Sequence, residues 1–154
     1  MRRCFLTGCY TGLIPKAPGT WGSLFGAILA YVLLQFLPQS TLFLLVILIT
    51  IVGIKEINIY ETATGRHDES SIVIDEIAGI WLAVSILPDI SPLWIAVAFA
   101  LFRYFDITKI SYIGKLEKLP GGYGVMADDL LAGLVAGLST GLVYVGVQGL
   151  LAYL

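Results

Sequence analysis

The chain alternates between long apolar runs and polar breaks of two lengths. Five apolar runs stand out, at residues 21–37, 41–54, 77–87, 92–105 and 130–154. They are continuous and show no alternation with a period of two, which favours helices over strands. Short, proline-containing turns separate some of the runs, at 38–40 and 88–92, whereas residues 55–76 and 106–129 form longer polar stretches. No linker divides the chain, and we interpret residues 1–154 as one domain.

The lengths of the runs do not decide between a membrane protein and an apolar soluble bundle. A helix that crosses a bilayer needs about 20 apolar residues, with about 17 as the lower limit. Only the first and last runs reach that length. The middle runs could cross by including flanking residues, with Lys55 and Arg103 reaching the surface along their apolar stems. They could equally form the core of a soluble helical bundle.

The distribution of charge favours the membrane. Hydrophobic residues make up 58% of the chain and charged residues 13%, against about 25% charged residues in soluble domains. All nine Lys and Arg residues lie near the N-terminus or in and beside the two long polar stretches, as do ten of the eleven acidic residues, with Asp89 as the exception. If the short turns face one side of a bilayer, every basic residue lies on the other side, and the positive-inside rule makes that side cytoplasmic.

These observations predict an all-α, multi-pass membrane helical bundle with four or five apolar helices and functional loops on the cytoplasmic face. Glycines at every fourth position of the last run, Gly133, Gly137 and Gly141, are typical of closely packed membrane helices, although apolar helices are often rich in glycine. A net charge of −2 provides no basic field for nucleic acid. Cys4 and Cys9 do not form a Cys-x-x-Cys pair, and we expect them to be reduced and structural.

The segment "PKAPGTWGS", residues 15–23, is a candidate phosphate site. Its backbone amides, the ammonium group of Lys16 and the hydroxyls of Thr20 and Ser23 suit a phosphate at the start of a helix. A loop of this composition can also simply begin a helix, and this segment alone leaves both interpretations open.

Two acidic segments precede apolar runs. "HDESSIVIDEIAG", residues 67–79, contains Asp68, Asp75 and Glu76, and "PGGYGVMADDLLAG", residues 120–133, contains two adjacent aspartates. The helix dipole favours an acid in a first turn by about 0.3–1 kcal/mol, but acids close to hydrocarbon are costly and usually functional. The only histidine, His67, could be a ligand, a proton carrier or a surface residue.

The two acidic segments share a spacing that places an acid and a glycine on one helix face. Asp75 precedes Gly79 by four residues, as Asp129 precedes Gly133, and a glycine allows another helix to approach closely. Two helix mouths with paired carboxylates could therefore converge on a divalent cation, and an oxygen-only ligand set favours Mg²⁺. Other residues could complete a phosphate site. The glycines Gly121, Gly122 and Gly124 would let the backbone approach a ligand. Arg103 with Asp106 in "FRYFD", and Lys109, are further candidates.

The segments "APGTWGSL", "HDESSIVIDEIAG", "FRYFD" and "LPGGYGVMADDLLAG" together resemble the ordered motifs of the phosphatidylglycerophosphatase A family, from about residue 11 to residue 137. The resemblance implies a Mg²⁺-dependent phosphatase that converts phosphatidylglycerophosphate to phosphatidylglycerol and phosphate on the cytoplasmic side of the bacterial inner membrane. It also implies that the motif carboxylates bind the metal: Asp68, Asp75, Glu76, Asp128 and Asp129. The chain departs from the family pattern after Asp106, where Lys109-Ile-Ser-Tyr stands in place of a Lys-Pro-x-Pro turn.

No pattern for a covalent nucleophile is present in the sequence, so we expect direct attack by metal-activated water. One of Asp68, Asp75, Glu76 and Asp129 would act as the base. The expected substrate contacts are Lys16, Thr20, Ser23, Arg103, Lys109, Gly121 and Gly122. One alternative is a small ion or metabolite transporter with an acidic pathway, and another is a scaffold in which the acids only cap helices.

Overall fold

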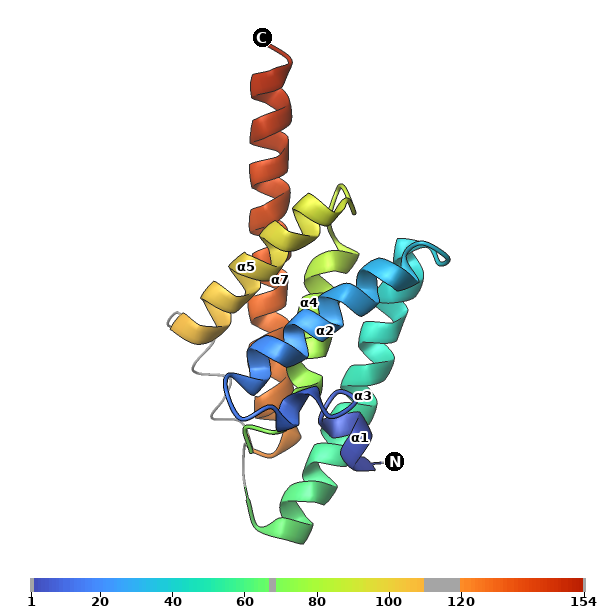
Figure 1. Ribbon diagram of the computed structural model, residues 1–154, viewed down its shortest axis with the longest axis vertical. Helices are drawn as coiled ribbons and strands as arrows, with labels where there is room; N and C mark the ends of the chain where they lie inside the picture. The colour runs from blue at the N-terminus through green and yellow to red at the C-terminus, as the bar shows by residue number, and fades with distance from the viewer. Residues whose placement is uncertain (1, 67–68, 110–119, 154) are drawn as a thin grey trace.

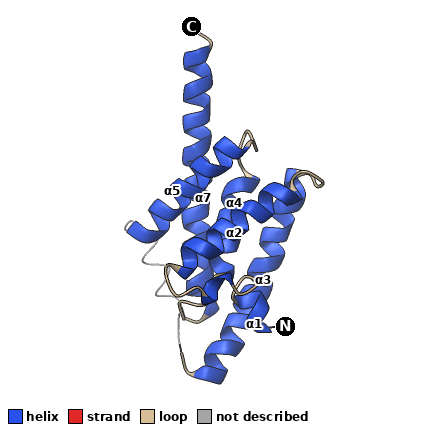
Figure 2. Ribbon diagram, viewed as in Figure 1, coloured by secondary structure: helices blue, strands red, loops and turns tan. Residues whose placement is uncertain are grey.

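A computed structural model describes residues 2–66, 69–109 and 120–153 of the chain. Within these ranges the secondary structure is helical, without strands (Figure 2). The helices are α1 (Arg2–Leu6), the 3₁₀ turn η1 (Thr11–Leu13), α2 (Pro18–Leu33), α3 (Gln39–Thr64), α4 (Ile74–Ser85), α5 (Pro92–Thr108) and α7 (Gly122–Leu151). The all-α prediction is confirmed for the described residues.

Helix α4 is the centre of the bundle. It packs against α2, α3, α5 and α7 (Figure 1). Its sequence, IDEIAGIWLAVS, is apolar nearly all round, as expected for a helix that is enclosed by its neighbours. Buried side chains run along its whole length, from Ile74 to Val84. A helix so enclosed provides a rigid support for the acids in its first turn.

The two short turns and the N-terminal helix lie at different ends of the bundle. The turns that join α2 to α3 and α4 to α5 lie toward one end, and α1 lies toward the opposite end (Figure 1). The helix ends that carry the acidic segments, at the start of α4 and of α7, lie toward the same end as α1 (Figure 1). This arrangement matches the separation of charge that the sequence predicted.

The two largest differences from the predicted element boundaries are in α3 and α7. Helix α3 continues ten residues beyond residue 54, because the polar segment 55–64 contains no helix breaker before Gly65, which ends the helix with a left-handed φ of 68°. Helix α7 begins at Gly122, eight residues before the predicted apolar run. Asp128 and Asp129 therefore lie in the second turn of α7 and not at its N-terminus.

In the part of the chain that the structure describes, two helices, α3 and α7, are long and apolar enough to cross a membrane. Only 22% and 28% of their most apolar windows are buried inside the bundle, and their outward faces present large apolar side chains such as Leu44, Ile51 and Leu142. Helix α2 is apolar but shorter. These features suggest a membrane protein, and the expected total of four or five crossing helices stays a prediction.

Candidate metal and phosphate site

Glycine contacts bring the acidic ends of α4 and α7 together. A Cβ added to Gly133 would lie 2.1 Å from the carbonyl oxygen of Gly79, and one added to Gly79 would lie 2.6 Å from the carbonyl oxygen of Asp129. The two helices therefore touch through their backbones, a separation that only glycine permits. Asp75 and Asp129 each lie one helical turn before the glycine of their own helix. The spacing in the sequence correctly predicted this convergence.

Three carboxylates meet beside this crossing. One ligand oxygen from each of Asp75, Glu76 and Asp129 lies within 4.8 Å of the others. Asp75 and Asp129 are buried, at 7% and 4% exposure, and Glu76 is half-buried. Asp75 and Glu76 lie in the first turn of α4, where the N-terminal dipole favours negative charge. The dipole of α4 alone does not balance three buried negative charges.

Helix α5 adds a fourth acid and a cation through its last turns. The Asp106 side chain lies close enough to Glu76 and Asp129 to influence their charge, and Arg103 Nη1 lies 2.7 Å from Asp106 Oδ2. Arg103 and Asp106 are three residues apart on one helix face, which brings both to the carboxylate cluster. The sequence places Asp106 near Arg103 in "FRYFD", and Asp106 was not among the expected metal ligands. The three-residue spacing of the pair on a helix was the signal that could have placed Asp106 near the cluster.

Several polar atoms of the cluster lack hydrogen-bond partners among the described residues, namely Asp75 Oδ1, Glu76 Oε2 and Arg103 Nε. Burial raises the pKa of Asp75 well above its ordinary value, and the negative charge of Glu76 adds to this rise. Burial likewise raises the pKa of Glu76, followed by the charge of Asp129. Buried carboxylate oxygens without partners and with an unfavourable negative charge fit a site that binds a cation.

An oxygen-only set with buried aspartates and a glutamate suits a hard divalent cation such as Mg²⁺ or Ca²⁺. Asp75, Glu76 and Asp129 are the described residues whose ligand atoms lie close enough to share one ion. The buried side chain of Asp128, the fourth acid expected to bind metal, lies 3.5 Å from Lys109 Nζ through its Oδ2. Asp68 and His67 lie outside the described residues.

The start of α2 closes one side of the cluster. A Cβ added to Gly19 would lie 2.0 Å from Glu76 Oε1 and 3.3 Å from Arg103 Nη1. The glycine of the "APGTWGS" segment thus lets the α2 backbone lie against the acids and the arginine. Lys16 is exposed in the loop before α2, and Thr20 is half-buried in its first turn. This placement brings the candidate phosphate segment to the carboxylate cluster.

Three of the expected phosphate contacts have other partners in the structure. Ser23 is completely buried, and its hydroxyl donates to the carbonyl oxygen of Gly19 at 2.6 Å. Gly121 and Gly122 face α3, where an added Cβ would lie 2.2 Å from Asn58 Oδ1 and 2.7 Å from the carbonyl oxygen of Ile54, respectively. These placements do not favour direct phosphate contacts for the three residues, whose expected substrate role stays a prediction.

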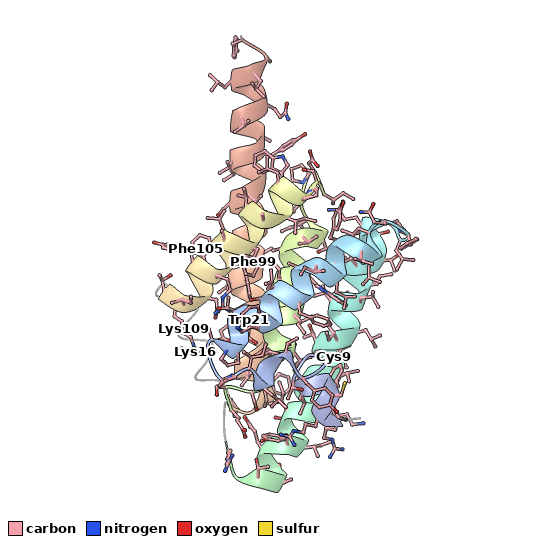
Figure 3. All side chains as sticks on the ribbon, viewed as in Figure 1. Cys9, Lys16, Trp21, Phe99, Phe105 and Lys109 are labelled. Carbon is pink, nitrogen blue, oxygen red and sulfur yellow. The ribbon has the colours of Figure 1, made fainter. Side chains whose placement is uncertain are left out.

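Lys109 and Lys16 lie on the same side of the bundle in Figure 3, near the end of α5 and the start of α2. Lys109 ends α5 in a left-handed conformation with φ of 42°. Its ammonium group faces Asp128, so the lysine balances an acid of the site. The residues that follow it, where the family's two prolines are missing, lie outside the described residues.

Comparison with known proteins identifies the family. The model of the phosphatidylglycerophosphatase A family matches residues 4–144. The chain belongs to this family. It is 42% identical to phosphatidylglycerophosphatase A of Haemophilus influenzae over 132 residues, covering 84% of this chain and 80% of that protein. It is 37% identical to the Escherichia coli protein of the same name, covering 89% of this chain and 78% of that protein.

A third relative carries a different name. A Bacteroides thetaiotaomicron protein, assigned provisionally by its name to the phosphatidylinositol-3-phosphatases, is 42% identical over 135 residues, covering 83% of this chain and 84% of that protein. No solved structure matches the chain. The membership identifies the chain as a phosphoric monoester hydrolase, and the resemblance seen in the four sequence segments is confirmed.

Proposed function

We propose that the chain hydrolyses phosphatidylglycerophosphate to phosphatidylglycerol and inorganic phosphate, with Mg²⁺ as cofactor. The observation that carries the proposal is the convergence of Asp75, Glu76 and Asp129 on one buried point, in a chain of this family. The substrate is a lipid whose headgroup ends in a phosphate monoester, and the chain would act as a multi-pass protein of the bacterial inner membrane. The site lies toward the end of the bundle opposite the two short turns, and the positive-inside rule supports the proposal that this end is cytoplasmic.

The protein residues divide into those that hold the cation and those that hold the phosphate. Asp75, Glu76 and Asp129 would bind the ion, with Asp68 and Asp128 as further candidates. A Mg²⁺ ion in this place would stabilise negative charge on the phosphate oxygens and lower the pKa of a bound water. Arg103, held in place by its pair with Asp106, faces the same cluster with an unpartnered Nε among the described residues.

The reaction breaks the bond between phosphorus and the glycerol oxygen and forms a new bond from phosphorus to the oxygen of water. A carboxylate of the cluster takes a proton from that water as it attacks. Arg103 and Lys16 stabilise the charge on the transferred phosphoryl group, and Arg103 offers a planar set of donors that suits phosphate. The leaving glycerol oxygen takes up the proton that the carboxylate received, which restores the carboxylate and completes the diol headgroup of phosphatidylglycerol.

The first experiment measures phosphate release from phosphatidylglycerophosphate by the detergent-purified protein, with Mg²⁺ and then with EDTA. Asp129→Asn removes one charge from the cluster and should lower turnover by at least about 100-fold, in the range seen when a strong electrostatic contact is lost from an active site. Asp89→Asn is the matched control, because Asp89 lies in the short turn at the other end of the bundle and bonds the amide of Ser91.

Phosphatidylinositol 3-phosphate serves as a comparison substrate in the same assay, because a relative carries that activity in its name. Faster phosphate release from this lipid than from phosphatidylglycerophosphate would overturn the proposed substrate but not the proposed phosphatase activity. Folded protein that releases no phosphate from either lipid would overturn the phosphatase proposal. A transporter, the alternative interpretation of the sequence, is not favoured, because the acids gather at one end of the bundle.

A further inference from the structure

The short helix α1 separates two cavities that share no residue with the carboxylate cluster. One cavity, of about 500 Å³, lies between α1, the end of α3 and the segment before α4. It is lined by polar and basic side chains, among them Arg2, Arg3, Thr7, Tyr60, Arg66 and Ser71. In Figure 3 Cys9, which follows α1, lies on the opposite side of the bundle from Lys16 and Lys109.

Counted over the described residues, the polar cavity has more positive than negative charge. Three arginines line it, and the acids that these residues place beside them are Glu69 in the lining and Glu56, which pairs with Arg2. Arg66 Nη1 lies 3.6 Å from Glu69 Oε2 with its side chain 71% exposed, so it can turn toward a ligand. Arg3 has no acidic partner among residues 2–66, 69–109 and 120–153.

Glu69 is held by neutral donors rather than by the arginines alone. The Tyr60 hydroxyl donates a hydrogen bond to one carboxylate oxygen, and the Ser71 hydroxyl donates to the other at 3.1 Å. The Tyr60 bond lowers the pKa of Glu69 below its ordinary value. An anion entering the cavity can therefore approach Arg3 and Arg66 while Glu69 stays bonded to Tyr60 and Ser71.

The second cavity lies on the other face of α1 and is apolar. It has a volume of about 400 Å³ and is lined by Cys4 and Phe5 of α1, with side chains from α2, α3 and α4 that include Phe25, Leu29, Ile49 and Trp81. The indole N–H of Trp81 donates to the carbonyl oxygen of Gly26 at 2.8 Å, so this lining side chain offers no unpaired donor. Such a cavity suits a hydrocarbon chain and not a polar ligand.

The two cavities together match one class of molecule. A free phosphate would fill the basic cavity and leave the apolar one unexplained, and an uncharged hydrocarbon would do the reverse. We propose that α1 carries an accessory site for an anionic phospholipid, with the lipid phosphate against Arg3 and Arg66 and one acyl chain along Phe5, Leu29 and Ile49. The site is separate from catalysis, and its ligand is an intact membrane lipid rather than the lipid that is hydrolysed.

Native mass spectrometry of the detergent-solubilised protein in EDTA measures the affinity for phosphatidylserine against that for phosphatidylcholine. Phosphatidylserine is anionic but has no phosphate monoester, so it is not a substrate of the proposed reaction. The Arg3→Gln, Arg66→Gln double variant should bind phosphatidylserine at least about tenfold more weakly, because each arginine beside an anionic lipid headgroup contributes to the binding free energy. Lys55→Gln is the matched control, because Lys55 is exposed on α3 and outside the cavity lining.

A second variant tests the acyl-chain half of the site. Leu29→Trp adds volume inside the apolar cavity and should weaken phosphatidylserine binding, whereas Leu48→Trp, on an exposed part of α3, should change it by less than about twofold. Unchanged thermal unfolding of each variant shows that it folds. Inorganic phosphate at millimolar concentration should not displace the lipid.

Three results would overturn the accessory site: equal affinity for the two lipids, equal affinity of the double variant and the Lys55→Gln control, or full displacement by inorganic phosphate with Leu29→Trp unaffected. The last result would assign the basic cavity to a small anion. None of them bears on phosphate release from phosphatidylglycerophosphate, so a failure here is distinguishable from a failure of the proposed phosphatase.

Discussion

The N-terminal half of α7, residues 122–137, and its C-terminal half, residues 138–151, are both rich in glycine, but their surroundings differ. In the N-terminal half, a Cβ added to Gly133 or Gly137 would meet backbone or side-chain atoms at less than 3 Å. In the C-terminal half, Gly146 and Gly149 have nothing within 4 Å, and this half extends beyond the rest of the bundle (Figure 1). Close packing therefore requires glycine at Gly133 and Gly137, whereas no neighbouring atom requires glycine at Gly146 and Gly149.

The difference follows the location of the candidate site. Asp128 and Asp129 are buried in the half that α4 and α5 cover. The other half presents Leu142, Val145 and Leu150 outward, at 76%, 66% and 64% exposure. A helix with such an apolar outward face suits a lipid surrounding. The glycine pattern therefore marks a helix contact only where a second helix packs against it.

The largest expected effect comes from Gly133→Ala. The added methyl group would lie 2.1 Å from the carbonyl oxygen of Gly79, so α4 and α7 must separate. We expect a loss of about 1–3 kcal/mol in the free energy of unfolding, as for other overpacked contacts. Asp129 would also move away from Asp75. Under the proposed function, phosphate release should then fall by about 100-fold, the size of effect that a small misplacement of a catalytic group can have. Thermal unfolding in detergent and the phosphate assay measure the two effects.

A Gly133→Ala variant with the unfolding temperature and activity of the native chain would contradict the backbone contact between α4 and α7. Gly141→Ala is the control within the same four-residue repeat. At that position the nearest atom, Pro88 Cδ, would lie 3.9 Å from the added Cβ, an ordinary van der Waals distance.

A smaller effect is expected from Asn58→Ala in α3, because the Asn58 side chain bonds the start of α7. Asn58 Oδ1 accepts a hydrogen bond from the amide of Gly122 at 2.8 Å, which ties the first turn of α7 to α3. Loss of a side-chain acceptor at a helix start costs about 1 kcal/mol, and thermal unfolding should report a loss of this size. Asn58→Asp keeps the acceptor and should lose less.

The control for this helix is Thr62→Ala, because the exposed Thr62 hydroxyl bonds only the carbonyl oxygen of Asn58 among the described residues. If Asn58→Ala and Thr62→Ala unfold at the same temperature, the bond between α3 and α7 does not stabilise the helix start.

The smallest effect is expected from Gly146→Ala, in the extended half of α7. An added methyl group meets no atom within 4 Å, and alanine favours a helix over glycine by up to about 1 kcal/mol. The unfolding temperature should stay the same or rise slightly, and phosphate release should not change. A marked fall in either would show that this half of α7 packs against a partner, and would remove the contrast between the two halves.

The sequence predicted the close approach of the two acidic helices because helical spacing is a local property. The four-residue interval from Asp75 to Gly79, repeated from Asp129 to Gly133, places an acid and a glycine on one face whatever the rest of the fold. It did not predict the burial of Ser23 or the partner of Gly122, because those features depend on helices that are distant in the sequence. The burial of Ser23 depends on where α2 packs, and no local pattern contains that information.

The sequence by itself determined that the chain is helical, that its charges gather toward one end and that its motifs are those of a phosphatase family. Continuous apolar runs, the placement of Lys and Arg and short motifs are all readable one segment at a time. Only the tertiary structure decided that Asp75, Glu76 and Asp129 share one point, that Asp106 joins them, and that α1 has a basic and an apolar cavity on its two faces. These features depend on the packing of helices against one another, which is set by contacts between residues far apart in the chain.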